Sequence, residues 1–77
     1  MIGYSLELAK ENRQANARHP GVKLGRLCIE HGVPISKVAT VCKVSRATVY
    51  NWFRGLVAPS KSKMVHIEAL LSKLQAK

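Results

Sequence analysis

The stretch that decides the fold is ISKVATVCKVSRATVYNWFR, residues 35–54. Its apolar residues recur at helical spacing on both sides of a short break, Lys43-Val44-Ser45. Ser45 is a residue type that caps helix N-termini. We expect two short helices here, whose inward faces carry Ile35, Val38, Ala39 and Cys42 in the first, and Val49, Trp52 and Phe53 in the second.

This arrangement is typical of a helix-turn-helix. Ala39 is small enough for two helices to cross closely, and Val44 can fill the gap between them. On these residues the chain resembles the Cro and lambda-repressor family of phage and bacterial regulators. The resemblance runs from about residue 27 through Gly55 and on into residues 60–74, and it leaves residues 1–19 outside.

Two features depart from that family. Lys43 stands where the family usually places Gly, and a non-Gly residue in left-handed backbone costs about 1 kcal/mol. Pro34 and Ile35 stand where the family favours a hydroxyl cap and a polar residue. Free backbone N–H groups at this helix start could still contact a phosphate.

On both sides of this segment, turn residues at 19–21, 32–34 and 55–60 divide the chain into shorter pieces. We expect helices over about residues 5–17, 22–31 and 60–75, with Gly32 ending the second and Ser60 or Ser62 starting the last. Residues 2–8 also alternate in a strand-like way. The prediction is one all-α domain over residues 1–77, a compact lambda-repressor-like bundle of four to five short helices.

The charge points to a polyanion as partner. Thirteen Lys and Arg oppose four Glu, which gives a net charge of +9. No acidic residue lies between Glu30 and Glu68. A surface of this kind gains binding free energy when phosphates displace condensed counterions.

The family resemblance implies that the second motif helix enters the DNA major groove. Arg46 can contact guanine and Asn51 can contact adenine, while Ala47 and the Thr48 methyl suit the thymine methyl. Trp52 is expected in the core. The candidate phosphate contacts are Lys37, Lys43, Ser45, Tyr50, Arg54, Lys61 and Lys63. Lys10, Arg13 and Arg18 could form an additional arm against the DNA backbone.

Other classes of function find little support in the sequence. We expect no enzyme and no small-molecule substrate, because no Gly-rich phosphate loop or catalytic cluster is present. We expect no cofactor and no metal, since Cys28, His31, Cys42 and His66 lack the paired spacing of a zinc site. No long apolar run or signal sequence appears, so we expect no membrane partner and a cytoplasmic protein of the bacterial cell interior, of phage or bacterial origin.

The predicted function is sequence-specific binding of double-stranded DNA, with transcriptional repression as a homodimer. Val65 and Leu70 could lie at the intersubunit face or in the monomer core. Two alternatives stay open. One is a DNA-docking module of a terminase or recombination complex. The other is a basic helical protein that binds and inhibits an acidic host protein.

Overall fold

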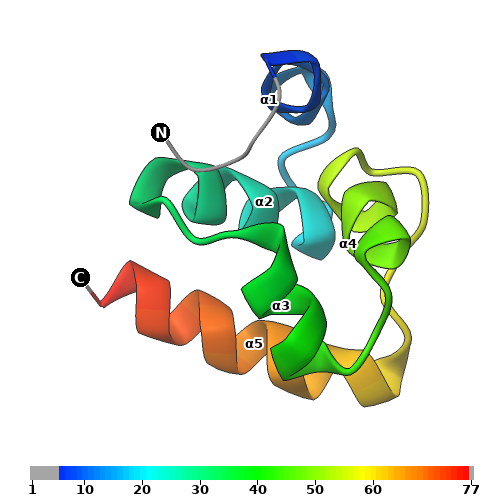
Figure 1. Cartoon of the computed structure of the whole chain (residues 1–77), viewed down its shortest axis with the longest axis vertical. Coiled ribbons are helices and arrows are strands. Elements are labelled where there is room, and N and C mark those ends of the chain that lie inside the picture. Colours follow the sequence, from blue (N-terminus) through cyan, green and yellow to red (C-terminus); the bar gives the residue numbers. More distant parts are fainter. Residues whose placement is uncertain (1–5, 77) are drawn as a thin grey trace.

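The computed structural model describes residues 6–76, and within them the chain forms five α-helices and no strand. In Figure 1, α2 lies between α1 at the top and α5 at the bottom, with α4 at the right-hand side. The expected all-α bundle is confirmed. The helices are α1 (Leu6–Gln14), α2 (Pro20–His31), α3 (Ile35–Cys42), α4 (Arg46–Phe53) and α5 (Lys61–Gln75).

The boundaries of α2 follow from local sequence. The side chain of His19 caps its start and accepts hydrogen bonds from the N–H groups of Gly21 and Val22. Pro20 occupies the first turn, where its missing N–H costs nothing. Gly32 ends the helix in left-handed backbone (φ 70°), as its sequence position predicted.

The positions at which α4 and α5 start also follow from the local sequence. The Ser45 hydroxyl accepts a hydrogen bond from the Thr48 N–H at 3.2 Å, so the expected cap is confirmed. Of the two serines considered for α5, Ser60 is the residue that precedes the helix. Ser60 and Ser62 share a hydrogen bond through their hydroxyl oxygens at 3.1 Å.

The N-terminal segment is helical where the structure describes it. The strand considered for residues 2–8 is wrong for residues 6–8, which start α1, and residues 2–5 lie outside the described range. The helix ends at Gln14, three residues earlier than the expected end at about residue 17. Leu, Glu, Ala, Lys, Arg and Gln all favour helix, and here this propensity prevails over the alternating apolar pattern.

The hydrophobic core joins all five helices. Each helix contributes at least one residue that is 3% exposed or less, among them Leu8, Leu24, Val38, Phe53 and Ile67. The expected inward faces of α3 and α4 are all buried, including Trp52 at 2% exposure. Further apolar side chains are only partly buried and pack at the edge of the core: Leu27, Met64, Leu70 and Leu71.

Two glycines let α2 approach α4 closely. A Cβ on Gly21 would lie 2.7 Å from both Cβ and the carbonyl oxygen of Trp52. One on Gly25 would lie 2.6 Å from the Asn12 amide nitrogen and 2.7 Å from the Phe53 ring. Real Cβ atoms do not tolerate such distances, so the packing of α2 on α4 requires glycine at both positions.

We predict that Gly21→Ala lowers the free energy of unfolding by about 1–3 kcal/mol, because the added methyl group meets backbone atoms of α4. The loss outweighs the gain of about 0.5–1 kcal/mol that Ala normally brings to a helix. Chemical denaturation measures the change. Lys23→Ala, at an exposed position of the same helix, is the matched control and should change stability by less than about 0.5 kcal/mol. A Gly21→Ala protein as stable as the parent would contradict the close packing.

Candidate nucleic-acid interface

A three-residue turn sets the angle between α3 and α4. Lys43 adopts left-handed backbone angles (φ 58°, ψ 47°), as its place at the turn predicted, and among residues 6–76 it is the one non-glycine with positive φ. The Val44 N–H then donates to the Ala39 carbonyl at 3.0 Å, which closes the end of α3. The Val44 side chain packs against the core as expected. The turn is therefore fixed on both its polar and its apolar side.

The helix α4 has an inward side and an outward side. Val49, Trp52 and Phe53 are buried, so they anchor the helix to the core. Arg46 and Ala47 are exposed at the start of the helix, and Asn51 is half-buried one turn further along. Thr48 is half-buried, and its hydroxyl lies 3.0 Å from the Ser45 hydroxyl, so its methyl group is the part left for an outside contact. The residues predicted to read bases thus lie on the side of α4 that faces away from the core.

The candidate phosphate contacts are spread over three elements. Lys37 is exposed on α3, Lys43 and Ser45 are exposed in the turn, and Lys61 is exposed at the start of α5. Lys63 is half-buried, and its positive charge partly opposes the rise in the pKa of Cys42 that burial causes. Because Cys42 is the last residue of α3, this places Lys63 near the turn.

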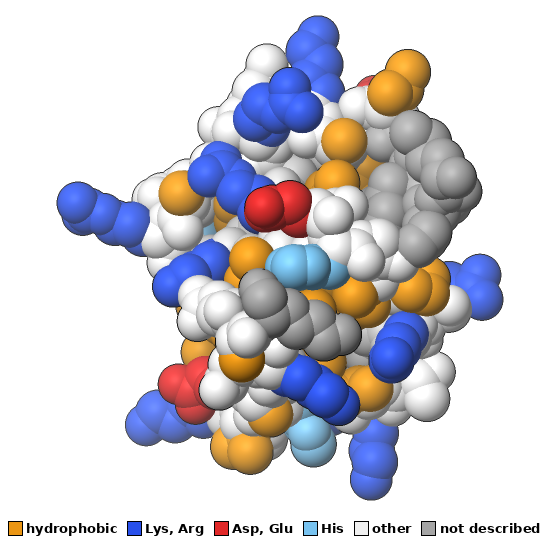
Figure 2. Space-filling view, turned by 90° about the vertical axis from the view of Figure 1, so that its left-hand side faces the viewer, with side chains coloured by type: hydrophobic (Ala, Val, Ile, Leu, Met, Phe, Trp, Pro, Cys, Tyr) orange, Lys and Arg blue, Asp and Glu red, His pale blue; other side chains and the backbone are white. Residues whose placement is uncertain are grey.

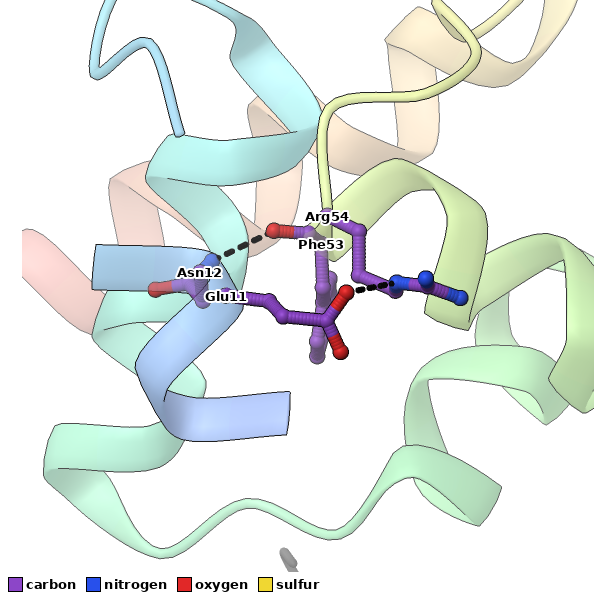
Figure 3. Close-up of polar contacts among 4 residues, drawn as sticks. All are labelled: Glu11, Asn12, Phe53 and Arg54. Carbon is purple, nitrogen blue, oxygen red and sulfur yellow. Dashed lines mark hydrogen bonds and ion pairs between the residues drawn. The ribbon is translucent and has the colours of Figure 1, made fainter. Parts of the chain in front are cut away.

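Arg54 is engaged within the protein, which sequence reasoning did not foresee. Its Nε donates to Oε2 of Glu11 at 2.8 Å, and both side chains are about one-third exposed. Figure 3 shows this ion pair between α1 and the residue that follows α4. A phosphate contact by Arg54 would have to share the guanidinium with Glu11. No sequence signal joins residues 43 positions apart, so only the tertiary structure could reveal the pair.

Polar contacts attach α1 to the helices beside it. The buried Asn12 amide donates to the carbonyls of Phe53 at 2.7 Å and Val22 at 3.1 Å (Figure 3 shows the first). Arg26 donates through Nη2 to the carbonyls of Asn12, Arg13 and Ala15, which closes the end of α1. The basic side chains considered as an arm, Lys10, Arg13 and Arg18, are exposed. Through the contacts of Asn12 and Arg26, the N-terminal segment from residue 6 onward packs as part of the bundle.

An apolar groove lies between α3 and α5. Val33, Val41, Leu70 and Leu74 line it together with the smaller Ala69, and Lys37, His66 and Lys73 stand around it. Figure 2 shows hydrophobic side chains surfacing among Lys and Arg side chains on one face of the molecule. Of the two residues considered for an intersubunit face, Leu70 lines this groove and Val65 is 67% exposed. Leu70 also packs against the edge of the core, whereas Val65 does not.

Both cysteines are buried free thiols, and Cys42 lies on the inward face expected for it. Burial, with a smaller contribution from Cys42, raises the pKa of Cys28 to about 12. Within residues 6–76 no group of three or more His, Cys, Asp or Glu side chains is placed to hold a metal ion. Over the same residues, no helix combines the length and apolar character needed to cross a membrane.

Comparison with models of known protein families, with curated proteins and with solved structures finds no match for this chain.

We predict that Lys43→Gly raises the free energy of unfolding by about 0.5–1 kcal/mol, because glycine adopts left-handed backbone without steric cost. Lys43→Ala removes the same charge but keeps a Cβ, so it should bring no such gain. Denaturant unfolding of both variants separates the backbone effect from the charge effect. If the Gly variant is no more stable than the Ala variant, Lys43 is not strained.

We predict that Cys28 in the folded protein resists thiol reagents near pH 8. With a pKa of about 12, only about one thiol in ten thousand is ionised there, and the thiolate is the reactive form. Reaction should accelerate as the pH rises toward 12, or when denaturant exposes the thiol. A Cys42→Ser variant isolates Cys28 for measurement with a chromogenic disulfide. Equal rates in native and denatured protein would contradict the burial.

Proposed function

We propose that α3 and α4 form a helix-turn-helix that binds double-stranded DNA in a sequence-specific way. The observation that carries the proposal is the division of α4 between a buried side and an outward side. Val49, Trp52 and Phe53 fix the helix, while Arg46 and Asn51 are left on the other side with no acidic residue in the 37 positions between Glu30 and Glu68. A helix held in this way can enter a major groove as a rigid unit.

The outward residues of α4 have the chemistry to distinguish bases. The Arg46 guanidinium forms two parallel hydrogen bonds with O6 and N7 of guanine, and the Asn51 amide does the same with N6 and N7 of adenine. Ala47 and the Thr48 methyl group contact the methyl group of thymine. Each good two-bond contact discriminates against the wrong base by about 1–3 kcal/mol.

The basic residues around α4 supply binding that is independent of sequence. Lys37, Lys43 and Lys61 come from α3, the turn and α5, and their ammonium groups neutralise phosphates on either side of the groove. Ser45 and Tyr50 offer hydroxyl groups to further phosphates. These contacts orient α4 on the duplex, so the base contacts are made in one register.

A single short helix reads only a few base pairs, which favours binding as a homodimer to two half-sites about one DNA turn apart. Val65, at 67% exposure on α5, is an apolar surface that a second copy could cover. The biological role we propose is transcriptional repression in the bacterial cell interior, by a protein of phage or bacterial origin. A DNA-docking module of a terminase or recombination complex would use the same α4 contacts without a palindromic site.

A second candidate function is binding of an acidic protein, and the groove between α3 and α5 favours it. Apolar side chains line this groove, and Lys37, Lys73 and His66 stand at its edge with no acidic lining residue. Such a groove suits an amphipathic segment with apolar and acidic side chains. Loss of DNA binding in Arg46 variants, with no effect of Leu70→Glu, would separate the first candidate from the second.

The experiment that tests the main proposal is selection of bound duplexes from a random DNA library. We expect enrichment of one short sequence, repeated as an inverted pair for a dimer. Affinity for random duplex should fall steeply with salt, and the selected site should bind about a thousandfold better than random DNA or more. If selection enriches no sequence, the protein is not a sequence-specific regulator.

We predict that Arg46→Ala weakens binding to the selected site by about 1–3 kcal/mol and relaxes the preference at one base pair. Lys61→Ala also removes one positive charge from an exposed position, and it should weaken binding to all DNA sequences alike. Titration of each variant against the selected site and single-base variants measures both effects. Equal, sequence-independent losses for the two variants would remove Arg46 from the base-reading set.

A further inference from the structure

The helix α1 borders the outward side of α4. Glu7, Leu8 and Glu11 from α1 line a hollow together with Tyr50 and Arg54. Tyr50 and Arg54 are four residues apart, so they lie on the same side of the helix as the outward residues Ala47 and Asn51. Any duplex that contacts this end of α4 therefore also comes close to α1.

The position of Glu11 is fixed by its neighbours. Asn12, the next residue, is 2% exposed and bonds the carbonyl of Phe53, which itself precedes Arg54. Arg26 bonds three carbonyls at the end of α1 and holds that end against α2. The carboxylate of Glu11 and the guanidinium of Arg54 thus extend from two backbones that are tied together one residue away.

The contact between them uses one edge of the guanidinium. Glu11 accepts a hydrogen bond from Nε at 2.8 Å. In Figure 3 the two terminal nitrogens of Arg54 lie on the other side of Nε from the carboxylate. The Arg54 side chain is 37% exposed, so part of it is open to solvent. An arginine held in this way presents a fixed pair of donors, the geometry that a phosphate accepts in two parallel hydrogen bonds.

We propose that Glu11 is a positioning residue for DNA binding, which holds Arg54 so that its terminal nitrogens donate to a backbone phosphate at the C-terminal end of α4. This inference rests on the proposed DNA-binding function. It makes α1, which lies outside the helix-turn-helix, part of the DNA-binding surface. The partner it assigns is a phosphate of the duplex, which fixes register without reading sequence.

Two opposing effects decide whether Glu11 helps or hinders. An arginine that binds a phosphate loses much of its rotamer freedom, and Glu11 has already removed that freedom before DNA arrives. The negative charge of Glu11 repels the phosphate. This repulsion is weakened because the Arg54 guanidinium would lie between the two charges, and because the side chains of Glu11 and Arg54 are both partly exposed to solvent and salt. The ordering effect is the larger, so the proposal requires that loss of Glu11 weakens binding.

The experiment compares Glu11→Ala, Glu11→Gln, Arg54→Ala and the Ala–Ala double variant in binding to one duplex. Glu11→Ala should weaken binding by about threefold, because Arg54 loses its orientation. Glu11→Gln should bind as well as the parent or better, since its amide oxygen still accepts from Nε while the negative charge is gone. Arg54→Ala should lower the slope of log affinity against log salt by about 0.9, the loss of one phosphate contact. The double variant should be no weaker than Arg54→Ala alone.

Glu30→Ala is the matched control, because it removes the same charge from an exposed position on α2, outside the hollow. It should leave affinity unchanged or raise it slightly. Circular dichroism and thermal unfolding establish that every variant is folded at the assay temperature, and rescue by Gln distinguishes positioning from loss of α1.

Several results would overturn the proposal. Tighter binding by Glu11→Ala would mean that the carboxylate masks Arg54. Unchanged binding would mean that the carboxylate does not position Arg54 for DNA. An equal loss from Glu11→Ala in the Arg54→Ala background would mean that Glu11 does not act through Arg54. Absence of DNA binding by the parent protein would remove the proposed function itself, which is a different result from intact binding that ignores Glu11.

Discussion

Gly21 and Gly25 allow α2 to lie directly against Trp52 and Phe53, with no side chain between the two helices at these points. This close approach determines where α4 sits. Because Trp52 and Phe53 pack against α2, the opposite side of α4, which carries Arg46 and Ala47, faces solvent. The short turn at residues 43–45 then has to connect α3 to a helix whose place is already fixed, and the left-handed backbone of Lys43 is the local cost of that connection.

A different kind of interaction holds α1. Its helix buries one large apolar side chain, Leu8, and relies otherwise on hydrogen bonds to backbone carbonyls. The Asn12 amide reaches both α2 and the end of α4, and Arg26 closes the end of α1. A buried amide is strongly destabilising when its partners are missing and modestly stabilising when they are present, so these bonds select one position for α1 more than they add stability.

The two attachments together explain how the candidate DNA-binding surface is arranged. The apolar contacts of α4 hold it rigidly to the core, and the polar contacts of α1 bring Glu11 to the far end of the same helix. The surface therefore begins at the exposed Arg46, which we propose contacts a base, and ends at Arg54, which Glu11 holds in place. The groove between α3 and α5 carries its own basic edge, and Lys37 belongs both to that edge and to the candidate phosphate contacts, so DNA and a second partner would share this residue.

Most of the local structure could be predicted from the sequence. Helical spacing of apolar residues predicted α2 to α5, and the cap at Ser45, the stop at Gly32 and the strained Lys43 followed from the backbone preferences of single residues. These features depend on neighbours within one or two turns. The tertiary structure alone decided that α1 packs on α4, that Asn12 is buried and that Arg54 pairs with Glu11. Each of these contacts joins residues about 40 positions apart, and no periodicity or cap signals which distant helix will supply the partner.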